Sequence, residues 1–353
     1  MTLSCPSCNR RFKDRWRCVC GSPLQFETRP TPSRLVSPID PRAGLWAFED
    51  FFPESWHPRI SLGEGMTPLA SASEWEASFK LEYVSPTGSF KDRGATTTIS
   101  RAAHLGENHV IEDSSGNAGL AIATYAARAG IDATIYAPAD AAPKKLEAIR
   151  RTGADLRTIE GNRQAVTDAC LEAVENDEGW YASHAWNPAF FVGTSTAAIE
   201  IAFQRDWQAP DAVVTPVGHG TLLIGLYRGF SALESAGWIA RVPRLYAVQA
   251  AGVAPIVEAL GREAGNSRNE VASGVQIDEP VQRELIIEAI TRTNGDAIAV
   301  DDTSVMDALG RLHTAGFGCE PTSALGPAGL LRLRDGGSIE IGEDVVVPLT
   351  GAN

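Results

Sequence analysis

The chain has 353 residues, 44% of them hydrophobic, which is enough for two domains with substantial cores or one large α/β domain. Its formal net charge of −13 argues against a nucleic-acid-binding surface, because such a surface needs a basic footprint. The first residues lack the basic and apolar regions of a secretory signal, and no apolar run is long enough to cross a membrane. We therefore expect a cytoplasmic protein with no nucleic-acid or membrane partner.

Four of the six cysteines lie within the first twenty residues, spaced as Cys5-x2-Cys8 and Cys18-x-Cys20. Two close pairs of thiolates suit tetrahedral zinc, and so short a segment cannot bury a hydrophobic core of its own. Because four cysteines leave no open coordination position, the spacing predicts a structural zinc ribbon over residues 1–26, in a reducing compartment. The alternative is a set of free thiols in a disordered tail.

The segment that follows is rich in Pro, Ser and Arg over residues 27–45 and predicts an extended linker. Residues 61–69 form a loop punctuated by glycines, and residues 79–84 alternate between polar and apolar side chains as a strand does. This expected strand leads directly into a Pro/Gly turn.

Lys91 stands at the end of that turn, in the stretch Ser85-Pro86-Thr87-Gly88-Ser89-Phe90-Lys91-Asp92-Arg93, and the chain has only five lysines. A lysine amine becomes a nucleophile when burial or a neighbouring cation lowers its pKa, and Arg93 lies two residues away. The same stretch also fits a turn followed by a solvated charged face. The stretch alone does not distinguish a nucleophilic lysine from a solvated one, so the other motifs of the chain have to decide between them.

Strands and helices alternate through the rest of the chain. The expected strands are residues 110–113, 133–137, 156–159, 212–217, 245–249, 298–300 and 345–349. The expected helices are residues 94–105, 120–129, 143–152, 162–176, 194–203, 222–233, 281–294 and 303–315, with a last one through residue 334. This alternation predicts an α/β protein with doubly wound, mostly parallel sheets.

Two loops between a strand and a helix have the composition of anion sites: Ser114–Gly119 and Gly218–Thr221. At such positions backbone N–H groups and the helix dipole face the ligand. Each loop also fits an ordinary turn, capped by serine in the first case. Thr350 and Gly351 follow the last buried strand, at the edge where open α/β sheets contact ligands. With Lys91, these features suit pyridoxal phosphate, among several phosphate ligands.

Several of these motifs resemble the signatures of fold type II pyridoxal-phosphate-dependent enzymes of the tryptophan synthase beta superfamily, and threonine synthases most of all. The matching segments, in the family's order, are Leu62–Leu69, Ser85–Arg93, Ser114–Gly119, Glu160–Asn162, Asn187–Pro188, Glu320–Ala324 and Leu349–Gly351. The cysteine ribbon is similar to one that many threonine synthase-like proteins carry. The resemblance implies a two-domain fold type II enzyme with an N-terminal zinc ribbon.

The domains that the resemblance implies divide the chain at several points. Residues 1–26 form the ribbon, and residues 27–94 form a linker and the first part of a large cofactor domain. Residues 95–192 form a small α/β domain, and residues 193–353 complete the large domain.

The resemblance also assigns roles to residues. Lys91 is expected to form a Schiff base with pyridoxal 5′-phosphate and then to shuttle protons. The other expected cofactor contacts are Asn117, Gly218, His219, Gly220, Thr221, Leu222 and Thr350. The expected substrate contacts are Thr87, Ser114, Ser115 and Ala118, and the expected zinc ligands are Cys5, Cys8, Cys18 and Cys20. Glu320 either approaches the cofactor or serves at the start of a helix.

The expected activity is that of a lyase of amino-acid biosynthesis, converting O-phospho-L-homoserine and water to L-threonine and phosphate. The substrate stays open, because the loop at Gly218 lacks the asparagine usual in threonine synthases. Candidates for the required second phosphate site are Lys144, Arg150, Arg151 and Arg163. The alternatives are a serine/threonine dehydratase, another amino-acid β-replacement or elimination enzyme, or a non-enzymatic zinc-ribbon module with a relict cofactor domain. The expected partner is a small amino-acid substrate, and many relatives are homodimers.

Overall fold

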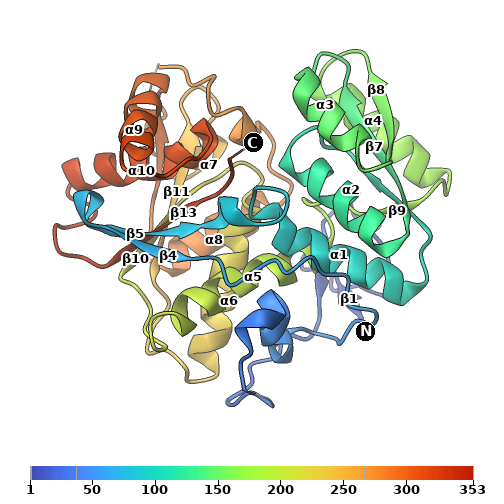
Figure 1. Ribbon diagram of the computed structural model, residues 1–353, viewed down its shortest axis with the longest axis horizontal. Helices are drawn as coiled ribbons and strands as arrows, with labels where there is room; N and C mark the ends of the chain where they lie inside the picture. Colours follow the sequence, from blue (N-terminus) through green and yellow to red (C-terminus); the bar gives the residue numbers. More distant parts are fainter. Residues whose placement is uncertain (1, 37, 266, 353) are drawn as a thin grey trace. The chain divides into compact units, whose positions relative to one another are not determined.

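The structure is a computed structural model that describes residues 2–36, 38–265 and 267–352. The described chain divides into two compact units (Figure 1). Unit 1 comprises residues 2–30, 38–64 and 91–194, and unit 2 comprises residues 31–36, 65–90 and 195–352. The chain therefore passes between the units more than once, and one passage falls between Phe90 and Lys91.

Unit 1 begins with the cysteine-rich segment, which forms a small antiparallel sheet in the order β2-β1-β3. Its strands are β1 (Leu3–Ser4), β2 (Arg11–Phe12) and β3 (Gln25–Phe26). Leu3, Leu24 and Phe26 pack with Trp46 and Trp56 in one hydrophobic cluster. A 3-10 helix, Pro41–Phe51, begins within the segment expected to be an extended linker, and its side chains Leu45 and Trp46 belong to this cluster.

The main part of unit 1 is a four-stranded parallel sheet in the order β8-β7-β6-β9. The strands are β6 (His109–Glu112), β7 (Asp132–Pro138), β8 (Asp155–Ile159) and β9 (Trp180–Tyr181). The helices are α1 (Lys91–Leu105), α2 (Asn117–Ala129), α3 (Pro143–Arg150) and α4 (Arg163–Glu175). Helix α2 packs on α1 and on β7, and α4 packs on β6, β7 and β8. The alternating strands and helices of the sequence thus form one parallel sheet here.

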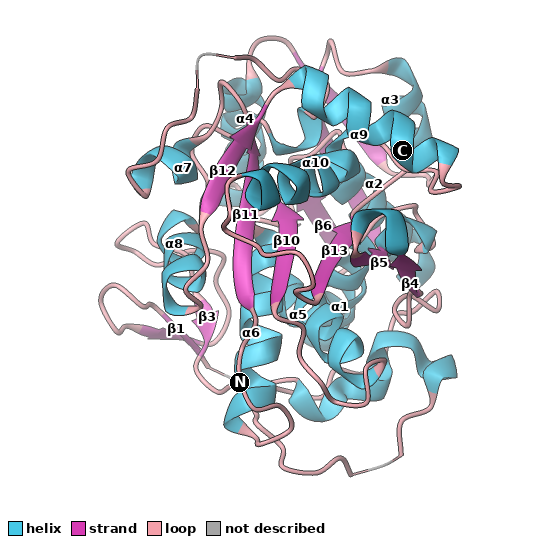
Figure 2. Ribbon diagram, turned by 90° about the vertical axis from the view of Figure 1, so that its left-hand side faces the viewer, coloured by secondary structure: helices cyan, strands magenta, loops and turns pink. Residues whose placement is uncertain are grey.

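Unit 2 contains a six-stranded sheet in the order β12-β11-β10-β13-β5-β4, which is parallel except for β4 (Figure 2). The strands are β4 (Leu69–Ala72), β5 (Ala77–Leu81), β10 (Ala212–Pro216), β11 (Arg244–Ala250), β12 (Ala297–Val300) and β13 (Val345–Leu349). All side chains of β10 and β13 are buried, as expected for central parallel strands. The predicted α/β fold with mostly parallel sheets is confirmed.

Helices cover the sheet of unit 2. They are α6 (Thr221–Ser235), α7 (Pro255–Ala259), α8 (Arg283–Arg292), α9 (Asp302–Thr314) and α10 (Pro321–Asp335), and α5 (Pro188–Phe203) runs into this unit from unit 1. Helix α10 packs on β10, β11, β12 and β13, whereas α6 and α8 pack on β11 (Figure 2). Among the described residues, no helix combines the length and apolarity needed to span a membrane.

Strand β5 ends at Leu81, and Glu82–Val84 forms a 3-10 turn, so the expected strand over residues 79–84 is shorter than predicted and begins earlier. Within β5, the Lys80 side chain is completely buried. Its Nζ donates to Glu200 Oε2 at 2.9 Å, to the Thr67 carbonyl oxygen at 2.6 Å and to Gln204 Oε1 at 2.9 Å. Both side chains of the Lys80–Glu200 ion pair are 0% exposed. A buried ion pair of this kind stabilises only while both partners are present.

We predict that Glu200→Ala lowers the free energy of unfolding by about 3–5 kcal/mol, because it removes a buried carboxylate that pairs with the buried Lys80 ammonium. The double variant Lys80→Met/Glu200→Leu should recover most of this loss, since it removes both charges and keeps the volume. Urea denaturation followed by circular dichroism measures both values.

The matched control is Glu147→Ala, which breaks the exposed ion pair with Arg151 on α3. It should change the free energy of unfolding by less than about 0.5 kcal/mol, because solvent screens exposed pairs. A Glu200→Ala loss no larger than this control would contradict the prediction.

Candidate active site

The turn before Lys91 is paired through its backbone with the end of β13. The Phe90 N–H donates to the Thr350 carbonyl oxygen at 3.0 Å, and the Ala352 N–H donates to the Gly88 carbonyl oxygen at 3.0 Å. An antiparallel bridge between Ser89 and Gly351 lies between these two bonds. The residue immediately before Lys91 is thus held against Thr350, which lies 260 positions further along the chain.

Lys91 is the first residue of α1 and is half-buried. The next two side chains, Asp92 and Arg93, are 0% exposed. The interpretation of this stretch as a solvated charged face is therefore wrong. Lys91 Nζ lies 6.0 Å from the centre of the Phe190 ring, which belongs to α5 and packs against the backbone of α1 at Gly94. The lysine amine therefore lies beside one aromatic ring, that of Phe190, within unit 1.

The Ser114–Gly119 loop connects β6 to α2, as predicted. Helix α2 begins at Asn117 without a side-chain cap, so its first turn directs backbone N–H groups toward the loop. The Ser114 hydroxyl accepts the Gly116 N–H at 3.3 Å. A Cβ atom at Gly119 would lie 1.8 Å from the Ser114 carbonyl oxygen, so only glycine allows the loop to fold this closely onto the helix. The loop has the geometry of a small anion site.

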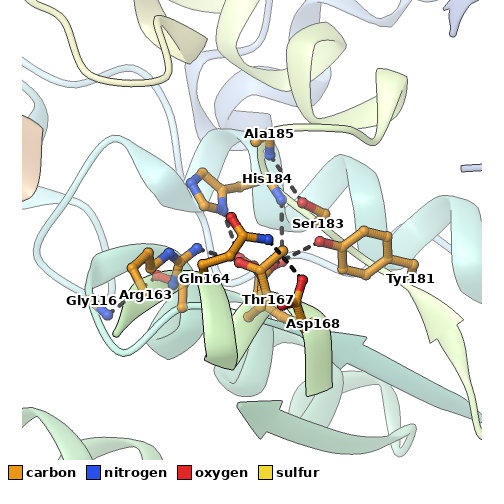
Figure 3. Close-up of polar contacts among 12 residues, drawn as sticks. Gly116, Arg163, Gln164, Thr167, Asp168, Tyr181, Ser183, His184 and Ala185 are labelled. Carbon is orange, nitrogen blue, oxygen red and sulfur yellow. Dashed lines mark hydrogen bonds and ion pairs between the residues drawn. The ribbon is translucent and has the colours of Figure 1, made fainter. Parts of the chain in front are cut away.

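A cluster of ionisable side chains that sequence reasoning missed lies beside this loop (Figure 3). Glu112 Oε1 is 2.6 Å from His184 Nδ1, and Glu112 Oε2 accepts the His184 backbone N–H at 3.2 Å. Asp113 accepts hydrogen bonds from three side chains, which Figure 3 labels: Tyr181 at 2.8 Å, Thr167 at 2.9 Å and Arg163 at 3.1 Å. The one signal in the sequence was a pair of carboxylates directly after the apolar residues of β6.

Burial sets the protonation of this cluster. It raises the pKa of Glu112 to about 8, against the opposing charges of Arg163 and Lys91. It also raises the pKa of Asp113, and the neighbouring Glu112 carboxylate adds to this rise. For His184, burial and then the Lys91 charge lower the pKa well below its usual value. At neutral pH, the Glu112–His184 pair therefore carries one shared proton and no net charge.

In unit 2, the Gly218–Leu222 segment connects β10 to α6. Gly220 occupies the N-cap position with φ 72°, and a Cβ atom there would lie 2.4 Å from Ile286. Both the left-handed backbone and the close contact require glycine. Thr221 and Leu222, at the helix start, are buried. The N-cap residue Gly220 has no side chain to cap α6, so backbone N–H groups at this N-terminus can accept an anionic group.

Thr350 lies at the carboxyl end of β13 and is 5% exposed. Its hydroxyl is 3.1 Å from the Ser323 hydroxyl, which also contacts the backbone of Gly351. Glu320 is the N-cap residue of α10, without a side-chain cap bond, and its backbone N–H donates to Gly351. Ser323 was part of a matching motif but had no assigned role, since only the fold brings it to Thr350.

The four cysteine Sγ atoms lie within 4.8 Å of one another. The distance is 3.5 Å between Cys5 and Cys20 and 3.4 Å between Cys8 and Cys18. Tetrahedral zinc with Zn–S bonds of about 2.3 Å separates its sulfur ligands by about 3.8 Å. The cluster therefore has the donor set and spacing of a four-cysteine metal site.

Comparison with known proteins shows similarity over most of the chain. Residues 60–351 match the family "Pyridoxal-phosphate dependent enzyme". A threonine synthase of Methanocaldococcus jannaschii is 33% identical over 323 residues, covering 87% of this chain and 80% of the relative. A threonine synthase of Methanosarcina acetivorans is 34% identical over 324 residues, covering 87% and 79%.

A solved structure shares the fold. The processed form of threonine deaminase isoform 2 from Solanum lycopersicum superposes with a TM-score of 0.69 at 23% identity, over 81% of this chain and 79% of that chain.

The residues present fit the family's cofactor. The N-terminus of α6, which begins after Gly220, suits a phosphate group, and the Thr350 hydroxyl suits a ring nitrogen. The half-buried Lys91 amine suits a covalent link to an aldehyde. The family match, the identity to the two synthases and the shared fold agree with these features: the chain belongs to the pyridoxal-phosphate dependent enzymes of fold type II.

Proposed function

We propose that this protein is a lyase of the threonine synthase kind, which converts O-phospho-L-homoserine and water to L-threonine and phosphate. The observation that carries the proposal is the 33–34% identity to threonine synthases over 87% of the chain. Pyridoxal phosphate, when bound, supplies an electron sink that stabilises a carbanion at Cα of the substrate.

The residues of unit 1 bind and activate the substrate. Lys91 holds the cofactor through Nζ and, once released from it, moves the proton at Cα. Ser114, Ser115 and Ala118 bind the substrate carboxylate at the start of α2. The family resemblance also assigns a substrate contact to Thr87. Asn117 donates to the cofactor's ring oxygen. The uncapped helix and the folded loop support these roles.

The residues of unit 2 orient the cofactor. Gly218, His219, Gly220, Thr221 and Leu222 hold its phosphate at the start of α6. The Thr350 hydroxyl would donate a hydrogen bond to the pyridine nitrogen, and this neutral partner would leave the nitrogen unprotonated. Ser323, at 3.1 Å from Thr350, orients that hydroxyl. An unprotonated ring suits elimination and replacement at the substrate side chain.

O-Phosphohomoserine also needs a cation for its own phosphate. Lys144 and Arg150 are exposed on α3, and Arg151 pairs with Glu147. Arg163 differs, because it lies by the carboxyl end of β6 and is 43% exposed. We therefore assign the substrate phosphate to Arg163 among the four candidates.

The second candidate function is a serine/threonine dehydratase. The Asp113–Arg163 ion pair, at 3.1 Å, favours this alternative because the carboxylate already neutralises the guanidinium. A dehydratase needs no second phosphate site, so the pairing of Arg163 with Asp113 would not impair binding of its substrate.

Reduction with borohydride should attach a phosphopyridoxyl group to Lys91, detected by peptide mass spectrometry after loading with pyridoxal phosphate. Lys91→Ala should lose the absorbance band of the lysine-bound cofactor and all turnover, because no other described lysine replaces its amine. Lys144→Ala, on the exposed face of α3, should keep both. A modified peptide without Lys91 would contradict the assignment.

Phosphate release from O-phospho-L-homoserine and 2-oxobutyrate release from L-threonine separate the two candidate functions. We expect wild-type protein to release phosphate at a kcat/KM at least tenfold above that for 2-oxobutyrate, which corresponds to about 1.4 kcal/mol of selectivity in the transition state. The reverse preference would establish the dehydratase instead.

We propose in addition that Cys5, Cys8, Cys18 and Cys20 bind structural zinc. The ribbon that they close contacts the four-stranded sheet of unit 1. Trp16 makes edge-on contacts with Tyr181 and Trp186, at 5.3 and 5.2 Å between ring centres. Asp14 accepts from Arg101 at 2.6 Å. A bound metal would stabilise the ribbon in the shape that makes these contacts, because the hydrophobic core of the ribbon is too small to stabilise this shape alone.

Purified protein should contain one zinc per chain by elemental analysis. Cys8→Ser should lose it and should change the near-ultraviolet circular dichroism of the tryptophans, since Trp16 leaves its packed position. Cys319→Ala, a buried cysteine of unit 2, is the matched control and should keep the metal. Equal zinc in Cys8→Ser and wild type would refute the site.

A further inference from the structure

The Glu112–His184 pair has no part in the roles assigned above, although both side chains are almost completely buried. Glu112 contacts the ring and the backbone of His184 at once, with a 2.6 Å distance to Nδ1 and a 3.2 Å distance to the backbone nitrogen. This double contact fixes the imidazole orientation and turns Nε2 away from the carboxyl group. Such an arrangement of carboxyl and imidazole holds a proton and can pass it on.

The fold puts this pair at the substrate edge of unit 1. Strands β6 and β9 are parallel neighbours, so Glu112 at the end of β6 and His184 beyond β9 lie at the same edge as Ser114. The His184 ring is 6.0 Å from the centre of the Phe190 ring, which is also the ring that Lys91 Nζ approaches. One aromatic side chain thus contacts both the lysine and the imidazole.

The remaining part of a bound amino acid is its side chain. With the carboxylate at Ser114 and Cα at Lys91, only the atoms from Cβ outward are left to meet His184. In both candidate reactions, an oxygen is gained or lost at Cβ, and the proton on that oxygen must move. The site therefore needs an acid–base group in addition to Lys91, which accepts or donates this proton.

We propose that His184, oriented by Glu112, moves the proton of the oxygen that is bonded to Cβ of the substrate. The inference rests on the proposed function, since it requires that a Cβ–O bond is made or broken. In the synthase direction, the phosphate leaves Cγ, and one hydrogen is lost from Cβ while one is gained at Cγ. The water oxygen then forms the bond to Cβ while Nε2 takes one water proton, and this proton balances the charge of the released phosphate. In the dehydratase direction, the Cβ–O bond breaks and Nε2 gives its proton to the departing hydroxide.

The charged groups that face the pair are Lys91, Asp113 and Arg163. Burial raises the pKa of Glu112 to about 8, so its carboxyl group is protonated below that pH. The carboxyl O–H then donates a hydrogen bond to Nδ1, and Nε2 carries the ring hydrogen. Above that pH, ionised Glu112 accepts from Nδ1–H, and Nε2 becomes a base. Water addition should therefore speed up as the pH rises through about 8, whereas loss of hydroxide should slow down.

The test compares His184→Gln and Glu112→Gln with wild-type holoenzyme. Turnover of O-phospho-L-homoserine and of L-threonine reports chemistry at the Cβ–O bond. Exchange of the α-hydrogen of L-2-aminobutyrate in heavy water, followed by NMR, reports Lys91 and the cofactor alone, because this amino acid has no oxygen at Cβ. The matched control is His109→Gln, whose ring contacts Thr134 at the opposite end of β6.

We expect His184→Gln to lose roughly 10²- to 10⁴-fold in kcat while keeping α-hydrogen exchange and the cofactor absorbance band. Glu112→Gln should lose the change in rate near pH 8, since an amide does not titrate. His109→Gln should match wild type in all three measurements. Parallel loss of exchange and turnover in both variants, or unchanged turnover, overturns the proposal. Wild-type protein that exchanges the α-hydrogen but turns over neither Cβ–O substrate overturns the proposed function, and the inference with it.

Discussion

The backbone pairing between the turn before Lys91 and the end of β13 is the constraint on which the candidate site depends. The bond from Phe90 N–H to the Thr350 carbonyl and the bridge between Ser89 and Gly351 hold the two segments together. They do so at the carboxyl edge of a parallel sheet, where the strand ends leave backbone groups for loops and ligands. The lysine therefore follows a fixed point rather than a mobile loop.

Burial, more than the pattern of charges, decides what the ionisable residues do. Lys80 and Lys91 are separated by only ten residues, yet Lys80 is fully buried with Glu200 as its counter-ion, whereas Lys91 is half-buried beside Phe190. Likewise, desolvation pushes the pKa of Glu112 up and that of His184 down, so a carboxyl and an imidazole in contact share a proton instead of forming an ion pair.

The cysteine-rich ribbon and the four-stranded sheet of unit 1 illustrate how a segment with too small a core obtains its shape from neighbours. Trp16 contacts Tyr181, and the Tyr181 hydroxyl donates to Asp113. A line of direct contacts thus runs from the ribbon to the cluster at the end of β6, all of it inside unit 1. Folding of the ribbon and order in that cluster are physically linked through these aromatic contacts.

Much of the fold could be predicted from the sequence, because its signals are local. A run of apolar residues, such as Val345–Leu349, identifies a buried parallel strand. A glycine loop before a helix identifies a candidate anion site. Neither signal requires knowledge of distant contacts. The burial of Lys80 in β5 could not be predicted, because its partner Glu200 lies in α5, 120 positions further along the chain. Local patterns carry no information about such partners.

The sequence by itself determined the alternating elements, the four-cysteine spacing and the lysine motif, since each is a matter of residue type and short-range order. Only the tertiary structure decided that Asp92 and Arg93 are buried, that Ser323 meets Thr350, and that Glu112 meets His184. These contacts join residues far apart in the chain, and their energies depend on exclusion of water, which only the packed protein provides.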